Sequence, residues 1–320
     1  MYVDYELLAT LLGINAIGAL GYYVTFSSGQ FSMAHGAMFL IGGYAGGYLA
    51  MTYDLPLIAT LVSAFVVAAA VGGALALALY RTRGLYFAVA TLAFGGVVVE
   101  GAKHLEFLGG AFGLGGIPPY TTLPVVLVVL ALLTLGVWAF DRSPLYVAHA
   151  SARIDQDAAV VLGINVRSTR SFAFAVGGGI CGVAGALYAG STTIVTPANG
   201  AFAQSLAFLL MVVIGGANSW RGPLLGALIW TGLPELLRST DEWRMVAFGV
   251  AAIALMVWRP QGLIPRRILG PGAREWLRRV AGRPSSGGAT DDALPAPAAA
   301  APDDAGRTER SLLAESAAER

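Results

Sequence analysis

The chain has 320 residues, of which 56% are hydrophobic and 12% are charged, and its formal net charge is +1. Soluble domains carry roughly 25% charged residues, so this composition excludes an ordinary soluble protein and predicts a membrane protein. The basic residues lie in loops and the tail, so no nucleic-acid surface is expected. The single cysteine, Cys181, excludes an internal disulfide.

Apolar segments alternate with short polar stretches along most of the chain. In order, they are approximately Tyr5 to Val24, Gly36 to Thr52, Pro56 to Tyr80, Leu85 to Val99, Leu123 to Phe140, Ser171 to Gly190, Phe202 to Gly216, Gly222 to Leu237 and Met245 to Trp258. Several are shorter than the roughly 20 residues that cross a bilayer comfortably. The expected fold is an all-α polytopic membrane helix bundle of about 8–10 transmembrane helices, some broken or re-entrant.

The arginines predict which connections face the cytoplasm. One polar loop carries Arg142, Arg153, Arg167 and Arg170, and further arginines follow the last apolar segment between residues 259 and 283. By the positive-inside rule, both regions are cytoplasmic. Counting back places Arg81 and Arg83 inside, and residues 101–122, residues 191–200 and the stretch STDEWR outside. The amino terminus is then outside, unless the first segment is re-entrant.

Composition divides the chain into three parts. Residues 1–264 form the predicted permease domain, and residues 265–283 form a basic juxtamembrane segment. That segment is either an interfacial amphipathic helix or a simple positive-inside anchor. Residues 284–320 are rich in Ala, Pro, Ser and Asp, without a hydrophobic period, and predict a disordered cytoplasmic tail.

Signatures of enzymes are missing from the sequence. The chain has no HExxH, no CxxC pair and no nucleophile elbow, and Lys103 is its only lysine, so it has no Walker A phosphate loop. We therefore expect no catalytic residue, no metal site and no cofactor, with any ATP bound by other subunits. The run GGGICG at residues 177–182 matches GxGxxG formally, but within an apolar segment it predicts close helix packing.

Polar residues at membrane depth are costly and point to function. The sequence FSSGQFSMAHG, residues 26–36, concentrates Gly29, Gln30, Ser32 and His35 between two apolar segments. Such a stretch predicts an interrupted helix that lines a translocation path, with its polar groups bonded to freed backbone groups. The alternative is a short loop with an interfacial His35. Glu100 is also assigned to the path, although it could simply pair with Lys103, one helical turn away.

Several long motifs resemble those of the permeases of branched-chain amino acid ABC importers. They are GYYVTFSSGQFSMAHGAMFLIGGYAGG, RTRGLYFAVATLAFG, GGAFGLGGIP, AAVVLGINVRSTRSFAFAVGGGICGVAGALYA and VTPANGAFAQSLAFLLMVVIGGANSWRGPLLGALI. The resemblance extends from about Gly21 to Leu263 and is to the LivM-like subunit rather than the LivH-like one. Two positions depart from the family pattern: Gly96 and Leu85 stand where an acidic residue is common.

This resemblance implies a bacterial plasma-membrane subunit with several partners. They are a homologous LivH-like permease, two cytoplasmic ABC ATPases and an extracytoplasmic solute-binding protein. It also implies that the loop at about residues 141–170 docks in a cleft of the ATPase. Carried over onto this sequence, the docking residues are Arg153, Ala158, Ala159 and Gly163, beside which lie Asp155 and Asp157.

Other functions remain open at this point. Related permeases import urea, short amides or aromatic acids instead of branched-chain amino acids. An ion-coupled secondary transporter would need paired intramembrane acids, of which the chain has few. An intramembrane enzyme would need a nucleophile and a base on facing helices, for which Ser32 and His35 are a conceivable pair at helical spacing, although no second motif supports them.

Overall fold

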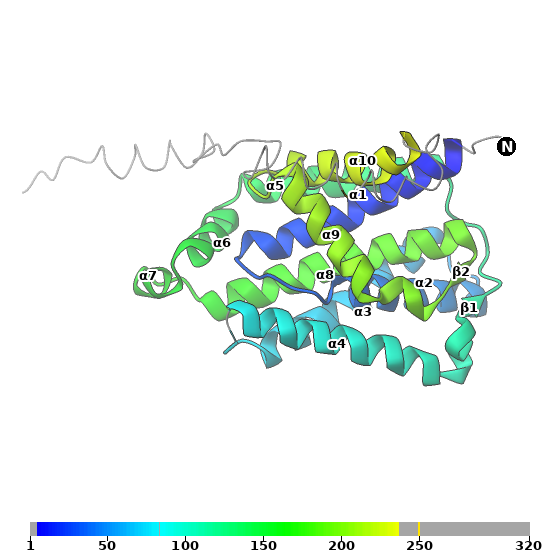
Figure 1. Ribbon diagram of the computed structural model, residues 1–320, viewed down its shortest axis with the longest axis horizontal. Helices are drawn as coiled ribbons and strands as arrows, with labels where there is room; N and C mark the ends of the chain where they lie inside the picture. The colour runs from blue at the N-terminus through cyan, green and yellow to red at the C-terminus, as the bar shows by residue number, and fades with distance from the viewer. Residues whose placement is uncertain (1–4, 83, 237–248, 250–320) are drawn as a thin grey trace, which may run out of the picture. The chain divides into compact units, whose positions relative to one another are not determined.

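A computed structural model of the chain describes residues 5–82, 84–236 and 249, and this part is almost entirely helical (Figure 1). All of these residues belong to one compact unit, Met1–Glu275. The α-helices are α1 (Tyr5–Ser27), α2 (His35–Tyr53), α3 (Leu57–Ala78), α4 (Gly84–His104), α5 (Leu123–Asp141), α6 (Pro144–Ile154), α7 (Gln156–Val161), α8 (Val166–Thr192), α9 (Phe202–Gly215) and α10 (Arg221–Leu236). The all-α prediction is confirmed.

Five helices in the described part are long and apolar enough to cross a membrane, namely α1, α3, α4, α5 and α8. The last predicted span at residues 245–258, the STDEWR stretch, Arg83, the basic segment at 265–283 and the tail at 284–320 lie outside the described residues. Helix α4 continues to His104 and α8 begins at Val166, so both extend further into polar sequence than their apolar segments predict.

Helix α8 lies at the centre and packs against α1, α2 and α3. Its glycines allow this close approach: Gly177 abuts Gly21 of α1, and Gly182 abuts Gly42 of α2 and the Ala64 carbonyl of α3. In lipid, helices associate through such packing rather than through hydrophobic burial, so small residues at the interface are favoured. The prediction that GGGICG packs helices is therefore confirmed.

The connections gather at two opposite ends of the helices (Figure 1). At one end, strand β1 (Leu114–Gly115) pairs antiparallel with strand β2 (Ile194–Val195), and three 3₁₀ turns lie nearby: Glu106–Leu108, Gly110–Phe112 and Pro197–Gly200. At the other end lie α6 and α7. Connections that the positive-inside rule assigns to the same side lie together. Strands β1 and β2 join residues 101–122 to residues 191–200 at one end. At the other end, Arg167 lies 4.5 Å from the centre of the Tyr80 ring.

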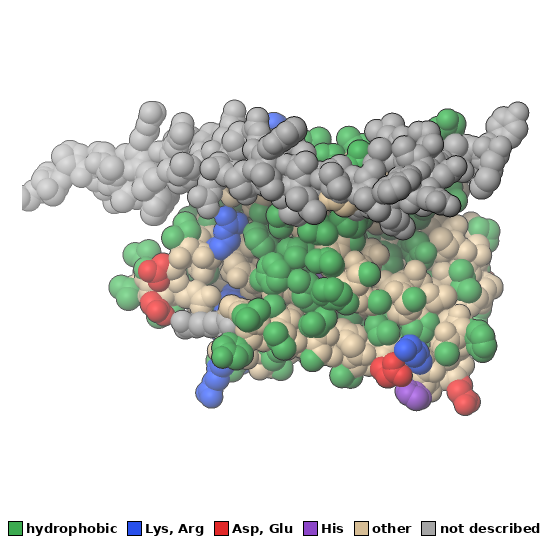
Figure 2. Space-filling view, viewed as in Figure 1, with side chains coloured by type: hydrophobic (Ala, Val, Ile, Leu, Met, Phe, Trp, Pro, Cys, Tyr) green, Lys and Arg blue, Asp and Glu red, His purple; other side chains and the backbone are tan. Residues whose placement is uncertain are grey.

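The outer helices expose apolar side chains. Only 11% of the most apolar part of α5 and 22% of that of α3 is buried, against 78% for α8. Apolar side chains cover much of the visible surface over the helices (Figure 2). Exposed apolar faces of this extent suit contact with lipid tails or with other membrane helices.

Replacing Gly185 of α8 with alanine should destabilise the helix bundle. The added methyl group would overlap the Phe39 carbonyl oxygen of α2, which cannot move without shifting that helix. Overpacking of this kind costs about 1–3 kcal/mol, so the apparent melting temperature in detergent should fall. Gly96→Ala is the control, because nothing lies within 4 Å of its added methyl. Equal melting temperatures for the two variants would contradict this packing role.

Candidate functional site

The connection between α1 and α2 is not helical, and its polar side chains are buried although Gly29 and Phe31 are exposed. Ser28, Gln30 and Ser32 are at most 1% exposed. Ser27 Oγ and Ser28 Oγ donate to the carbonyl oxygens of Val24 and Thr25 at the end of α1, at 2.7 and 2.8 Å. Gly29 makes the turn with φ +79°. The structure confirms the predicted interruption of the helix between α1 and α2. It also confirms that serine side chains bond to the backbone groups that the interruption frees.

Neighbouring helices complete the hydrogen bonding of this connection. The Met33 N–H donates to Thr91 Oγ1 of α4 at 3.0 Å, and the Gly36 N–H donates to Ser205 Oγ of α9 at 2.8 Å. Ser32 Oγ accepts from the Ala34 N–H at 3.1 Å. The start of α2 is therefore held by side chains of α4 and α9 and by Ser32 of the connection itself.

His35, the first residue of α2, lies wholly inside the protein. Its Nε2 is 2.9 Å from Thr25 Oγ1, and its ring packs against the rings of Tyr22 and Phe174, whose centroids are 4.7 and 5.2 Å away. The pairing of Ser32 with His35 that the alternative of an intramembrane enzyme would need is not observed, because each takes a different partner. His35 faces packed side chains here.

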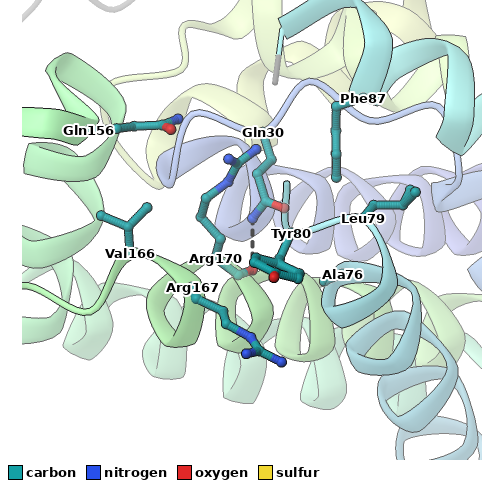
Figure 3. Close-up of a pocket in the computed structure, with 9 residues that line it drawn as sticks. All are labelled: Gln30, Ala76, Leu79, Tyr80, Phe87, Gln156, Val166, Arg167 and Arg170. Atoms are coloured by element: carbon teal, nitrogen blue, oxygen red, sulfur yellow. Dashed lines mark hydrogen bonds between the residues drawn. The ribbon is translucent and has the colours of Figure 1, made fainter. Parts of the chain in front are cut away.

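Gln30 links this connection to α8 and to a cavity. Its Nε2 donates to Ser28 Oγ at 2.8 Å and to the Arg170 carbonyl oxygen at 2.7 Å. A cavity of about 160 Å³ opens beside it, with Tyr80, Phe87, Gln156 and Arg170 among the lining residues (Figure 3). Of the residues predicted for a translocation path, Gln30 lines this cavity, whereas Gly29, Ser32 and His35 do not.

Glu100 does not lie with the other predicted path residues. Its side chain is 62% exposed near the β1–β2 end of α4, where Oε2 accepts from Lys103 Nζ at 2.8 Å. Its assignment to the same polar site is therefore corrected: the pairing with Lys103, the alternative reading of the sequence, is the one observed. Helical spacing of three residues brings these two charges together.

Helices α6 and α7 form a protruding element whose shape depends on two predicted residues. Asp155 Oδ1 accepts from the backbone N–H groups of Asp157 and Ala158, at 2.9 and 3.1 Å, and so caps the start of α7. Gly163, with φ +80°, ends the helix in the left-handed conformation that favours glycine. Asp155 and Gly163 thus set the two ends of α7, and Ala159 is the buried residue of that helix.

Four large apolar side chains are exposed on this element, beside the exposed Asp155 and Asp157. Ile154, Val160, Val161 and Leu162 are between 60% and 87% exposed. In Figure 2 apolar side chains at the α7 tip lie next to acidic ones. The resemblance implied docking through Arg153, Ala158, Ala159 and Gly163, and these large apolar side chains were not among the predicted residues. The sequence VVLG at residues 160–163 could have indicated these exposed apolar side chains, because three large apolar residues stand directly before a glycine.

Arg153 turns inward from this element instead of joining its exposed face. Its Nη1 donates to the Ala217 carbonyl oxygen at 3.3 Å, and its Nη2 donates to Asn218 Oδ1 at 3.2 Å, both in the α9–α10 connection. The guanidinium also lies 5.8 Å from the centre of the Phe26 ring at the end of α1. Arg153 was predicted to dock in the ATPase together with Ala158, Ala159 and Gly163. In the structure its guanidinium instead forms hydrogen bonds with residues of its own chain.

Two more residues that the sequence did not single out join the same end of the helices. Asp141, the last residue of α5, accepts from the Tyr23 hydroxyl at 3.0 Å and from the Trp220 N–H at 3.1 Å. His149 of α6 places Nδ1 3.3 Å from Ser27 Oγ. Burial lowers the pKa of His149 to about 4, so it is neutral near pH 7. Helices α1, α5 and α6 and the α9–α10 connection are therefore tied together.

Comparison with known proteins gives a consistent set of matches. The family model described as branched-chain amino acid transport system / permease component matches residues 5–257. The high-affinity branched-chain amino acid transport system permease protein LivM of Escherichia coli K12 is 31% identical, over 81% of this chain and 69% of that protein. Salmonella typhimurium LivM is 30% identical over the same shares. The autoinducer 2 import system permease protein LsrC of Yersinia enterocolitica is 29% identical over 55% of this chain and 50% of its own length. No solved structure matches the chain significantly.

Acid should destabilise the protein through His149. Because its pKa is about 4 in the folded protein and 6.5 ordinarily, the unfolded chain binds more protons between these values. Stability therefore falls as the pH drops through that window. His149→Gln cannot be protonated and keeps a group that can bond Ser27. Its melting temperature should change less than that of the wild type between about pH 7 and about pH 4.5; parallel pH profiles would contradict the assignment.

Proposed function

The chain belongs to the family of branched-chain amino acid transport system permease components, and on this premise we propose that it is the LivM-like membrane-spanning subunit of an ATP-binding cassette importer. The proposed cargo is branched-chain amino acids, because the two LivM proteins match more of the chain than LsrC does. The proposed location is the bacterial plasma membrane, with the α6–α7 end in the cytoplasm.

The transport energy comes from other subunits in this proposal. The only lysine is Lys103, and a Walker A loop requires a lysine to reach the phosphates. Two cytoplasmic ATPases therefore supply the motor, a homologous LivH-like permease completes the pore, and an extracytoplasmic solute-binding protein delivers the solute. The family membership supports this assembly, because permease components act within such transport systems.

The exposed apolar face of α6–α7 is the single observation that best supports ATPase docking. Four large apolar side chains on one short protruding element would be unfavourable in water, since each contributes about 1.5–3 kcal/mol when buried. A short helix inserted into a groove is a common mode of protein recognition. We therefore assign Ile154, Val160, Val161 and Leu162 as the surface that the ATPase covers.

The inward-facing side of α6 makes the contacts through which motion of the ATPases would reach the other helices. Arg153 is bonded to the α9–α10 connection, and His149 contacts Ser27 beside the interrupted connection of α1 and α2. A displacement of α6 is thereby transmitted to both sites. Such discrete hydrogen-bonded contacts between rigid helices are the physical means by which coupling travels. Alternating access then follows from rocking of these helices around the polar segment at residues 27–35.

Docking is tested by Val161→Asp in the reconstituted transporter. A charge on a side chain that is 87% exposed does not disturb the fold of the isolated chain, but it would be buried unpaired against the ATPase. The ATPase should no longer co-purify, or uptake should fall by at least about tenfold. Val161→Ile, which preserves the apolar surface, should behave as the wild type. Full uptake and assembly by Val161→Asp would remove the docking assignment.

Transmission is tested by Arg153→Gln. This variant should still bind the ATPases, because Arg153 faces away from the docking surface, yet stimulation of ATP hydrolysis by the loaded binding protein should fall about tenfold or more. The matched control is Arg142→Gln at the same end, whose guanidinium lies 4.0 Å over the Trp138 ring. Equal stimulation in the two variants would show that Arg153 carries no special role.

A further inference from the structure

A groove of about 530 Å³ runs between α3 and α8 near the end at which α8 begins. Its lining includes Gly73 and Leu77 of α3 and Arg167, Ser171, Phe172 and Ala175 of α8. Among the described lining residues it shares only Arg167 with the cavity beside Gln30, and in Figure 3 the Arg167 side chain extends away from Gln30. The groove is therefore a separate feature on the outside of the bundle.

The polarity of the groove changes in steps along α8. Arg167, Ser171 and Ala175 follow one another at intervals of four residues, so they lie one after the other on one face of the helix. The step from Arg167 to Ala175 covers about 12 Å at 1.5 Å per residue, within the roughly 15 Å of hydrocarbon in one leaflet. A guanidinium, a hydroxyl and a methyl group thus follow the order of the phosphate, the ester oxygens and the acyl chains of a phospholipid.

Two guanidinium groups lie beside one aromatic ring at the polar end of the groove. The guanidinium carbons of Arg167 and Arg81 are 4.5 and 5.3 Å from the centre of the Tyr80 ring, and Arg81 Nε donates to the Tyr80 hydroxyl oxygen at 2.6 Å. Neither arginine pairs with a carboxylate of the described residues, and no described lining residue of the groove is acidic. Guanidinium groups bind phosphate oxygens strongly, so this end favours a phosphate group.

The middle of the groove offers a hydroxyl that can bond a ligand. Ser171 Oγ is shielded from solvent and has no hydrogen-bond partner among the described residues. A buried hydroxyl without a partner is unfavourable, so an acceptor in the ligand would stabilise it. The ester carbonyl oxygen of a glycerolipid is such an acceptor, and it follows the phosphate at the depth at which Ser171 follows Arg167.

The deeper part of the groove is apolar and faces outward. Leu77 and Phe172 are 46% and 47% exposed, and only 22% of the most apolar part of α3 is buried. Gly73 and Ala175 carry little or no side chain, and a methyl group added to Gly73 would lie 3.4 Å from Ala175 Cβ. Their small size leaves room for methylene groups between the larger side chains, so an acyl chain fits along this surface.

We propose that this groove binds an anionic phospholipid, with its phosphate beside Arg167 and Arg81, its ester region at Ser171 and an acyl chain along the apolar part. Charge complementarity favours this occupant, because a zwitterionic lipid would bring a cation close to both arginines. Free phosphate would leave the apolar part uncovered. The lipid would stabilise the bundle, since it binds where α3 and the central helix α8 meet. This inference requires only that the chain spans a membrane, and it is independent of the solute and the motor of the proposed function.

The experiment is native mass spectrometry of the full chain in a neutral detergent, with phosphatidylglycerol and phosphatidylcholine that carry the same acyl chains. An arginine at a membrane surface strengthens the binding of an anionic lipid about fivefold. We therefore expect the chain to retain phosphatidylglycerol with an affinity at least about fivefold higher than that for phosphatidylcholine. The melting temperature in detergent should rise with phosphatidylglycerol more than with phosphatidylcholine.

Three variants locate the binding. Arg167→Gln should lower the affinity for phosphatidylglycerol about fivefold and leave that for phosphatidylcholine unchanged within about twofold. Arg142→Gln is the matched control, because it removes an arginine at the same end of the helices that lies over the Trp138 ring, outside the groove. Ala175→Leu keeps both arginines but fills the apolar part, and it should also weaken phosphatidylglycerol binding. Melting temperatures without added lipid establish that each variant is folded.

Several outcomes would overturn the inference. Equal affinity for the two lipids, or equal effects of Arg167→Gln and Arg142→Gln, would show only a nonspecific lipid layer. Tighter binding of inorganic phosphate than of phosphatidylglycerol would assign the charged end to a free anion. Loss of the lipid when the chain assembles with other membrane subunits would assign the groove to a protein interface. Retention of the lipid with the expected variant pattern supports the inference, whether or not the assembled transporter takes up a solute.

Discussion

Backbone polar groups in a hydrocarbon layer must find partners within the protein, and the interrupted connection between α1 and α2 is where this constraint is strongest. Its serines close the end of α1, while Thr91, Ser205 and the Arg170 carbonyl supply partners from α4, α9 and α8. The connection therefore fixes the relative positions of four other elements. A shift of any one of these helices must break or remake a buried hydrogen bond.

The glycines of α8 hold its neighbours in a different way, through close packing of helix backbones instead of hydrogen bonds between side chains. Gly182 lies against α2 and α3, and Gly177 lies against α1, with backbones close enough to exclude any side chain between them. Such interfaces are close-packed and resist deformation. Motion is consequently expected at the polar end, where α6 and the α9–α10 connection are joined by a few hydrogen bonds, rather than along α8.

The long helices of the described part could be located from the sequence, because each apolar run is bounded by polar or glycine-rich stretches. The predicted end of α4 was too early and the predicted start of α8 was too late, each by several residues. Both helices continue past their apolar runs, where charged side chains such as Lys103 and Arg167 reach water. The polar cluster at residues 27–35 was also visible locally. Its partners were not, because Thr91, Arg170 and Ser205 are far away in sequence and only tertiary packing brings them near.

Arg170 joins two of these features in one residue. Its backbone carbonyl holds Gln30 in place, while its guanidinium faces the cavity that Gln156 of α7 helps to enclose. Gln156 and Gln30 line the same cavity as Arg170, so a displacement of α7 would act on the residues that join the interrupted connection to α8.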